Sequence, residues 1–170
     1  MTEKNYTDIL PEDYRNKARE AFFSGLNCSQ SLVSAFAEYV DMDRSTLLKL
    51  SSSFGAGMGR LREVCGAVSG MFIIAGFLYG TDETAEKEEK ADHYRRIQHL
   101  AFEFMKKYDT LYCRDLLHLP PGPSDPVPAD RTPDYYAARP CPDFIGEAAF
   151  ILAEYLRNNP PKQTKNSPES

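Results

Sequence analysis

Hydrophobic residues recur along most of the chain at the three- and four-residue spacing of helices. The first such segment begins near Pro11, a residue suited to the first turn of a helix, and we expect it to end at Gly25. Asn27 is a candidate N-cap for a second helix, whose apolar face extends to Val40. Two helices joined by so short a connection predict a tight αα-hairpin.

Further helices are predicted in the middle of the chain, separated by segments that contain glycine or polar residues. A short helix starts at Asp43 or Ser45, and a loop with alternating glycines follows at 51–60. An uncharged central helix is expected at 64–80. A long amphipathic helix at 82–108 has acidic residues at its start and lysines at its end, as the helix dipole favours. Its predicted apolar stripe consists of Tyr94, Ile97, Ala101, Phe104 and Tyr108.

The C-terminal part of the chain combines a short helix, a proline-rich loop and a final helix. The short helix is expected over 111–117. The loop at 119–142 contains eight prolines, which exclude a helix or a central strand. So long a loop is either a lid or binding loop, or a solvated spacer. A final helix follows Pro142, and we expect a disordered tail at 159–170.

These elements predict an all-α fold, a bundle of about six helices with the proline-rich loop before the last one. The 170 residues suit a single domain, which we place at 1–158. The uncharged run at 64–80 is at the lower edge of the length of a membrane span, roughly 17–25 residues. Its five small residues lower its hydrophobicity and favour a buried central helix, so we do not expect a membrane protein.

Charge and composition restrict the partners and the compartment. The net charge of −5 and the pI near 5.3 argue against nucleic acid or an anionic membrane surface as a partner. The N-terminus lacks the basic and apolar segments of a secretory signal, so we expect a cytoplasmic protein. Thiols are mostly kept reduced there, and four cysteines therefore predict redox groups or metal ligands rather than structural cross-links.

All four cysteines lie at or near a predicted helix N-terminus. They are Cys28, Cys65, Cys113 and Cys141, and none belongs to a CxxC pair, so spacing alone indicates neither a zinc ribbon nor a thioredoxin-type site. A helix N-terminus offers free N–H groups and partial positive charge, which stabilise a thiolate and lower the pKa of a cysteine. The alternative is that these are ordinary buried cysteines that act as small hydrophobic residues.

The residues that follow Cys65 are unusually small for a core helix. Gly66, Ala67 and Gly70 form a stripe on which another helix can pack with its backbone close. If other helix starts approach this stripe, at least one further sulfur should come within disulfide or shared-metal reach of Cys65, with Cα atoms within roughly 7 Å for a disulfide. The alternatives are close packing without a purpose for the thiol, or a homodimer interface through this face.

Polar residues near the cysteines give weaker signals. Arg114, next to Cys113, either stabilises a thiolate or points to solvent. Glu63 lies two residues before Cys65 and would raise rather than lower the pKa of that thiol. His118 stands alone beside the proline-rich loop, which favours a surface or supporting role over metal ligation.

Four blocks of the sequence resemble the C_GCAxxG_C_C family, which is regarded as redox-active. The blocks are GLNCSQSLVSAF, FGAGMGRLREVCGAVSG, LYCRDLL and PCPDFIGEAAFIL, and together they span Gly25 to Leu152. The central motif here reads CGAVSG, whereas the family name places glycine before cysteine. The resemblance assigns the family's cysteines to Cys28, Cys65, Cys113 and Cys141, and its small residues to Gly66, Ala67 and Gly70. It implies thiol redox chemistry, since some members carry the more nucleophilic selenocysteine, but it favours no cofactor.

Three functions are consistent with these observations. In the first, a low-pKa thiolate, with Cys65 as our first choice, attacks a small oxidant or the disulfide of a redox partner protein, and a second cysteine resolves the product. In the second, the four thiolates hold an iron–sulfur cluster or zinc, for example for electron transfer. In the third, the cysteines are structural parts of a non-catalytic interaction module. We favour the first, because clusters usually take at least two ligands from one short segment.

Overall fold

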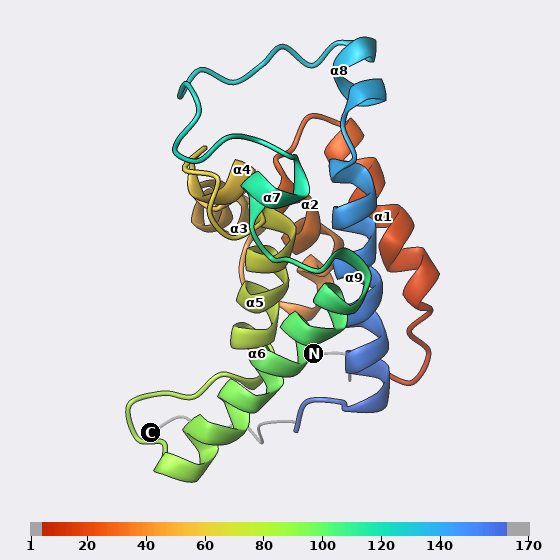
Figure 1. The fold of residues 1–170 in the computed structure, drawn as a ribbon. Coiled ribbons are helices and arrows are strands. Elements are labelled where there is room, and N and C mark those ends of the chain that lie inside the picture. Colours follow the sequence, from red (N-terminus) through yellow and green to blue (C-terminus); the bar gives the residue numbers. More distant parts are fainter. Residues whose placement is uncertain (1–4, 163–170) are drawn as a thin grey trace.

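A computed structural model describes residues 5–162 and shows helices throughout this range, without a strand (Figure 1). The helices are α1 (Pro11–Phe23), α2 (Cys28–Ala35), α3 (Arg44–Ser52), α4 (Gly55–Met58), α5 (Gly66–Tyr79), α6 (Lys87–Tyr108), α7 (Cys113–Leu116), α8 (Pro133–Ala138) and α9 (Cys141–Asn158), with a 3₁₀ turn η1 (Ala37–Tyr39). The predicted all-α fold is confirmed. Among residues 5–162, six of the helices have eight residues or more, in line with the expected number, and the short α4 and α8 are additions.

The helices pack around α5 and α9 (Figure 1). Helix α1 lies along α9, α2 packs against both α1 and α5, and α6 contacts α5 and α9 at the other side. One hydrophobic core runs between them, and its largest fully buried side chains include Phe22, Phe36, Phe104, Met71 and Leu152. Most of α5 is buried, as predicted for a central helix. No helix among residues 5–162 is long and apolar enough to cross a membrane.

The hairpin between α1 and α2 forms at the residues that mark it in the sequence. Gly25, with a φ of 106°, ends α1, and the amide of Leu26 reaches back to the carbonyl of Ala21 at 3.3 Å, as in a Schellman motif. Asn27 accepts a hydrogen bond from the amide of Gln30 at 2.9 Å and completes a capping box. The expected continuous helix to Val40 is wrong, because α2 ends at Ala35 and the chain continues through η1.

The long helix α6 begins at Lys87, five residues later than predicted. Asp82 accepts a hydrogen bond from the amide of Thr84 at 2.9 Å, and this local turn replaces the first helical turn. The capping box that starts α6 lies at Glu86 and Glu89 instead. The expected apolar stripe is correct for Ala101 and Phe104, which are buried, and partly so for Ile97 and Tyr108. It is wrong for Tyr94, which is 65% exposed, and it omitted the buried Leu100.

The proline-rich segment 119–142 contains a helix, contrary to our expectation. Pro133 lies in the first turn of α8, where its missing N–H has no consequence, and Thr132 caps the helix through the amide of Tyr135 at 3.1 Å. Residues 159–162 continue beyond α9 without helical structure. The remainder of the predicted tail, 163–170, lies outside the described residues.

Candidate functional site

Each of the four cysteines begins a helix, as predicted. Cys28, Cys113 and Cys141 are the first residues of α2, α7 and α9, and Cys65 is the N-cap of α5. All four are free thiols, Cys28 half-buried and the others buried. They line one cavity of about 10 Å³ together with Gly66, Leu116, Leu117 and Phe144. This volume is no larger than one water molecule needs, so the four helix starts enclose only a very small space between them.

Glycines in α5 allow this approach. A Cβ added at Gly66 would lie 3.0 Å from the Cβ of Cys28 and 2.8 Å from the carbonyl oxygen of Phe54. A Cβ at Gly70 would lie 3.0 Å from the carbonyl oxygen of Ser29 and 3.1 Å from the Cβ of Leu32. Helix α2 therefore packs on the small-residue stripe with its backbone close, as the sequence predicts. Within the described chain, α2 thus covers this stripe at Gly66 and Gly70.

Cys65 and Cys113 are held side by side by backbone hydrogen bonds. An isolated β-bridge joins Val64 to Tyr112, the residues that precede the two cysteines. The amide of Cys65 donates to the carbonyl of Leu111 at 2.8 Å, and the amide of Cys113 donates to the carbonyl of Glu63 at 2.7 Å. This pairing links two segments that are 48 residues apart in sequence.

The segment before α5, which includes the short α4, contains a left-handed turn that the sequence did not reveal. Residues 56–60 all have positive φ, including the non-glycine residues Ala56, Met58 and Arg60. Such residues cost about 1–2 kcal/mol each in this conformation, so the surrounding contacts must impose it. The backbone of this turn packs against Cys113, because a Cβ added at Gly57 would lie 2.6 Å from the Cβ of Cys113. The amide of Ala56 donates to the sulfur of Cys28, which lowers the pKa of that thiol.

Arg62 is a buried cation beside the thiols. Arg62 is only 3% exposed, and its Nη1 atom lies 3.7 Å from the sulfur of Cys113. Nε donates to the hydroxyl of Ser124 in the proline-rich loop at 2.8 Å. Arg114, one of the thiolate stabilisers that the sequence allows, pairs with Glu63 at 3.2 Å and stacks on Tyr112 instead. Arg62 lies before the motif among other charged residues, and this position gave no signal of its burial.

Burial outweighs the helix N-terminus at two of the thiols, contrary to our expectation. Burial raises the pKa of Cys65 to about 12, although the amides of Ala67 and Val68 act in the opposite direction. Burial also raises the pKa of Cys113, although Arg62 opposes the shift. Cys65 is therefore a neutral thiol near neutral pH, and Glu63 is not the main cause of its raised pKa.

Cys28 and Cys141 form a coupled pair with opposite shifts. The thiol of Cys28 donates a hydrogen bond to the sulfur of Cys141; this bond, followed by burial, raises the pKa of Cys28. The same bond is the largest cause that lowers the pKa of Cys141 to about 7, against the opposing effect of burial. Arg139 and Arg62 lower it further. Only Cys141 thus carries a substantial thiolate fraction near neutral pH.

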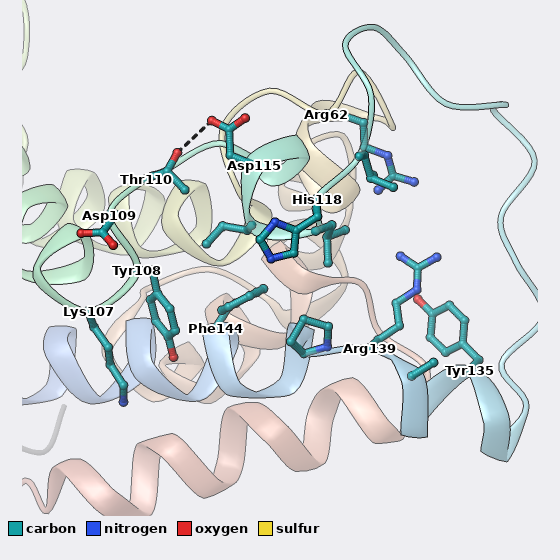
Figure 2. A pocket seen from close by; sticks show the side chains of 15 residues that line it. Arg62, Lys107, Tyr108, Asp109, Thr110, Asp115, His118, Tyr135, Arg139 and Phe144 are labelled. Atoms are coloured by element: carbon teal, nitrogen blue, oxygen red, sulfur yellow. Dashed lines mark hydrogen bonds between the residues drawn. The ribbon is translucent and has the colours of Figure 1, made fainter.

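A larger cavity of about 790 Å³ lies next to the cysteines (Figure 2). It shares Leu116, Leu117 and Phe144 with the small cavity, so these three side chains separate the two. Its other lining residues are Arg62, Lys107, Tyr108, Asp109, Thr110, Asp115, His118, Leu119, Tyr135, Ala138, Arg139 and Pro140. The segment 119–142 contributes several of them, which favours the binding-loop interpretation over the spacer. Arg139 is not among the residues predicted from the sequence, although it lies only two residues before Cys141.

The structure also bears on the alternative hypothesis of a metal or cluster site. Among residues 5–162, no group of three or more histidine, cysteine or acidic side chains is placed to hold a metal ion. The four candidate ligands line one small cavity, but no three of them are placed to bind one metal ion together in this arrangement.

Comparison with known proteins returned one family. A family model described as "Putative redox-active protein (C_GCAxxG_C_C)" matches residues 26–155. This range includes all four cysteines and the residues that line the two cavities. Neither the curated proteins nor the solved structures gave a match.

Proposed function

The chain belongs to the C_GCAxxG_C_C family of redox-active proteins, and from this premise we propose that it reduces disulfides with Cys141 as the attacking thiolate and Cys28 as the resolving thiol. One observation carries the proposal: a single hydrogen bond stabilises the thiolate of Cys141 and keeps Cys28 protonated. An attacking thiol works best when its pKa is close to the ambient pH, which is the state of Cys141. Cys65, our first choice from the sequence, has too high a pKa for this role.

In the first step, the thiolate of Cys141 attacks one sulfur of the substrate disulfide. A new S–S bond forms between Cys141 and that sulfur, and the S–S bond of the substrate breaks. The other substrate sulfur leaves as a thiolate with the electron pair of the broken bond and takes a proton from solvent. Arg139 and Arg62, which favour the thiolate of Cys141, also line the larger cavity.

In the second step, Cys28 resolves the mixed disulfide. Once Cys141 is bonded to substrate it carries no charge, so the main cause of the raised pKa of Cys28 is removed. The amide of Ala56 then stabilises the thiolate of Cys28. After Cys28 has lost its proton to solvent, its thiolate attacks the sulfur of Cys141. The Cys28–Cys141 bond forms, the mixed S–S bond breaks, and the second half of the substrate leaves as a thiolate that takes a proton from solvent. The substrate has gained two electrons, and the protein holds a Cys28–Cys141 disulfide.

An external dithiol reverses the change in the protein by the same two exchanges. It becomes a disulfide and returns Cys28 and Cys141 to their thiol forms, which completes the cycle. A cytoplasmic location would supply such reductants. Cys65 and Cys113 remain protonated throughout and serve to shape the cavity around the reacting pair.

The test traps the intermediate on the protein. Reduced protein is mixed with 2-hydroxyethyl disulfide and examined by intact-mass spectrometry, with each cysteine replaced by serine in turn. Cys28→Ser should accumulate one mercaptoethanol adduct on Cys141, and Cys141→Ser should neither form an adduct nor turn over. Cys113→Ser is the matched control, since it removes another buried thiol at a helix start and should preserve turnover. Normal turnover by Cys141→Ser would overturn the proposal.

A further inference from the structure

The larger cavity has the size and position of a substrate site for the thiols. Its volume of about 790 Å³ lies within the range of roughly 300–1,000 Å³ that small-molecule sites occupy. Leu116, Leu117 and Phe144 form one apolar wall, and they also line the small cavity that the four cysteines share. An occupant of the cavity is therefore one side-chain layer away from Cys141.

Positive charge is concentrated at one end of this cavity. Figure 2 shows Arg62 and Arg139 at the same end, with Tyr135 beside Arg139 and His118 nearer the middle. The Arg139 guanidinium lies 4.7 Å from the centre of the Tyr135 ring. Within residues 5–162, neither arginine forms an ion pair with a carboxylate.

The other charged groups of the cavity are neutralised or lie at its opposite end. Lys107 pairs with Glu147 at 2.6 Å. Asp115 accepts a hydrogen bond from Thr110 at 3.1 Å and lies 3.7 Å from Arg114. Figure 2 shows Lys107, Tyr108, Asp109, Thr110 and Asp115 away from the two arginines. The cavity is thus polarised, with an anion-attracting end next to the Cys141 side.

Arg62 is the most informative of these residues. A guanidinium that is almost fully buried costs free energy unless a negative charge or a full set of hydrogen bonds compensates for it. Two of its five N–H groups are directed at Ser124 and Cys113, neither of which is a carboxylate. The fork of an arginine matches two oxygens of one carboxylate, so an anionic ligand would supply the missing partner.

We infer that the larger cavity binds small disulfides that carry a carboxylate, with the carboxylate held by Arg62 and Arg139 and the sulfurs lying against the wall in front of Cys141. The disulfide part of this inference rests on the proposed function; the recognition of the anion does not. The inference favours a small-molecule substrate over a protein disulfide, because Cys141 is buried and the adjacent cavity has the volume of a small-molecule site.

The binding test separates charge recognition from chemistry. Cys141→Ser, which cannot attack, is titrated by calorimetry with three disulfides: 3,3′-dithiodipropionate with two carboxylates, neutral 2-hydroxyethyl disulfide, and cystamine with two ammonium groups. We expect the dicarboxylate to bind at least about tenfold more tightly than the other two, as one charge-assisted pair permits. Adding Arg139→Gln should abolish this preference. Arg131→Gln, which removes an arginine that stacks on Tyr135 at 5.0 Å but does not line the cavity, should preserve it.

The outcomes distinguish the inference from the proposed function. Equal affinity for the three compounds, or no binding of any, overturns the inference even if the unsubstituted protein reduces all three. Preferential binding of the dicarboxylate that survives Arg139→Gln also overturns it. If the preference is present and depends on Arg139, but the unsubstituted protein reduces no disulfide, the anion site stands and the proposed function fails.

Discussion

The α-carbon of Gly66 lies against Cys28: a Cβ at position 66 would be 3.0 Å from the Cβ of that cysteine. The same Cβ would also lie 2.8 Å from the backbone carbonyl oxygen of Phe54, which cannot move as a flexible side chain can. Gly66, the first glycine of the CGAVSG motif, therefore allows the N-terminus of α2 to approach the N-terminus of α5. Without that approach, Cys28 would not reach the other three thiols.

Gly66→Ala should destabilise the protein although alanine favours a helix. The helical preference contributes roughly 1 kcal/mol, whereas overpacking against fixed backbone typically costs about 1–3 kcal/mol. We expect a lower free energy of unfolding in urea. Gly76→Ala in the same helix is the matched control: a Cβ there meets nothing within 4 Å, so the free energy of unfolding should rise by roughly 0.4–1 kcal/mol. Equal effects of the two variants would contradict the close approach at Gly66.

The left-handed turn offers a second matched pair. Gly57 and Gly59 have nearly the same φ, 68° and 63°, so alanine at either position costs about 1–2 kcal/mol of backbone strain. A Cβ at Gly57 would also collide with Cys113, at 2.6 Å, whereas a Cβ at Gly59 meets only one atom, at 3.8 Å. Urea unfolding should therefore show a larger loss for Gly57→Ala, by a further 1–3 kcal/mol or so. A loss no larger than that of Gly59→Ala would show that the turn does not press on Cys113.

Alkylation of Cys141 should follow its lowered pKa. The thiolate fraction increases as the pH rises, so the rate of modification by iodoacetamide should increase through pH 7 and level off above it. Cys28→Ala removes the hydrogen bond that is the largest cause of the shift, and the midpoint should move to higher pH. Cys28→Ser keeps a donor and should move it less. A midpoint near the ordinary thiol value in the unsubstituted protein, measured on the peptide that contains residue 141, would contradict the activation of this cysteine.

The positions of the cysteines could be predicted because local residues mark helix starts. Asn27 forms a capping box immediately before Cys28, and Pro142 occupies the first turn of α9 next to Cys141. The small residues after Cys65 likewise indicated a close helix contact, which α2 provides. The capping residues and the small residues are all close in sequence to the cysteines, so one sequence is enough to recognise them.

The reactivity of the thiols could not be predicted in the same way. The pKa of Cys141 depends on Cys28 and Arg62, which come from segments more than 75 residues away, as well as on the nearby Arg139. Burial, which decides the pKa of Cys65, is a property of the whole packed core. The positive φ values of Ala56, Met58 and Arg60 also have no local signal, since such residues rarely adopt them. The larger cavity likewise brings together α6, α7 and the loop before α9.

The most direct test of the account is the disulfide that forms when the protein is oxidised. The fully reduced protein is oxidised with a limiting amount of 2-hydroxyethyl disulfide, the remaining thiols are alkylated, and the chain is digested without reductant for mass spectrometry. We expect a single linked peptide pair that joins Cys28 to Cys141, with Cys65 and Cys113 alkylated after unfolding. A disulfide between Cys65 and Cys113, or four thiols that remain unlinked, would contradict the assignment of Cys141 and Cys28 as the reacting pair.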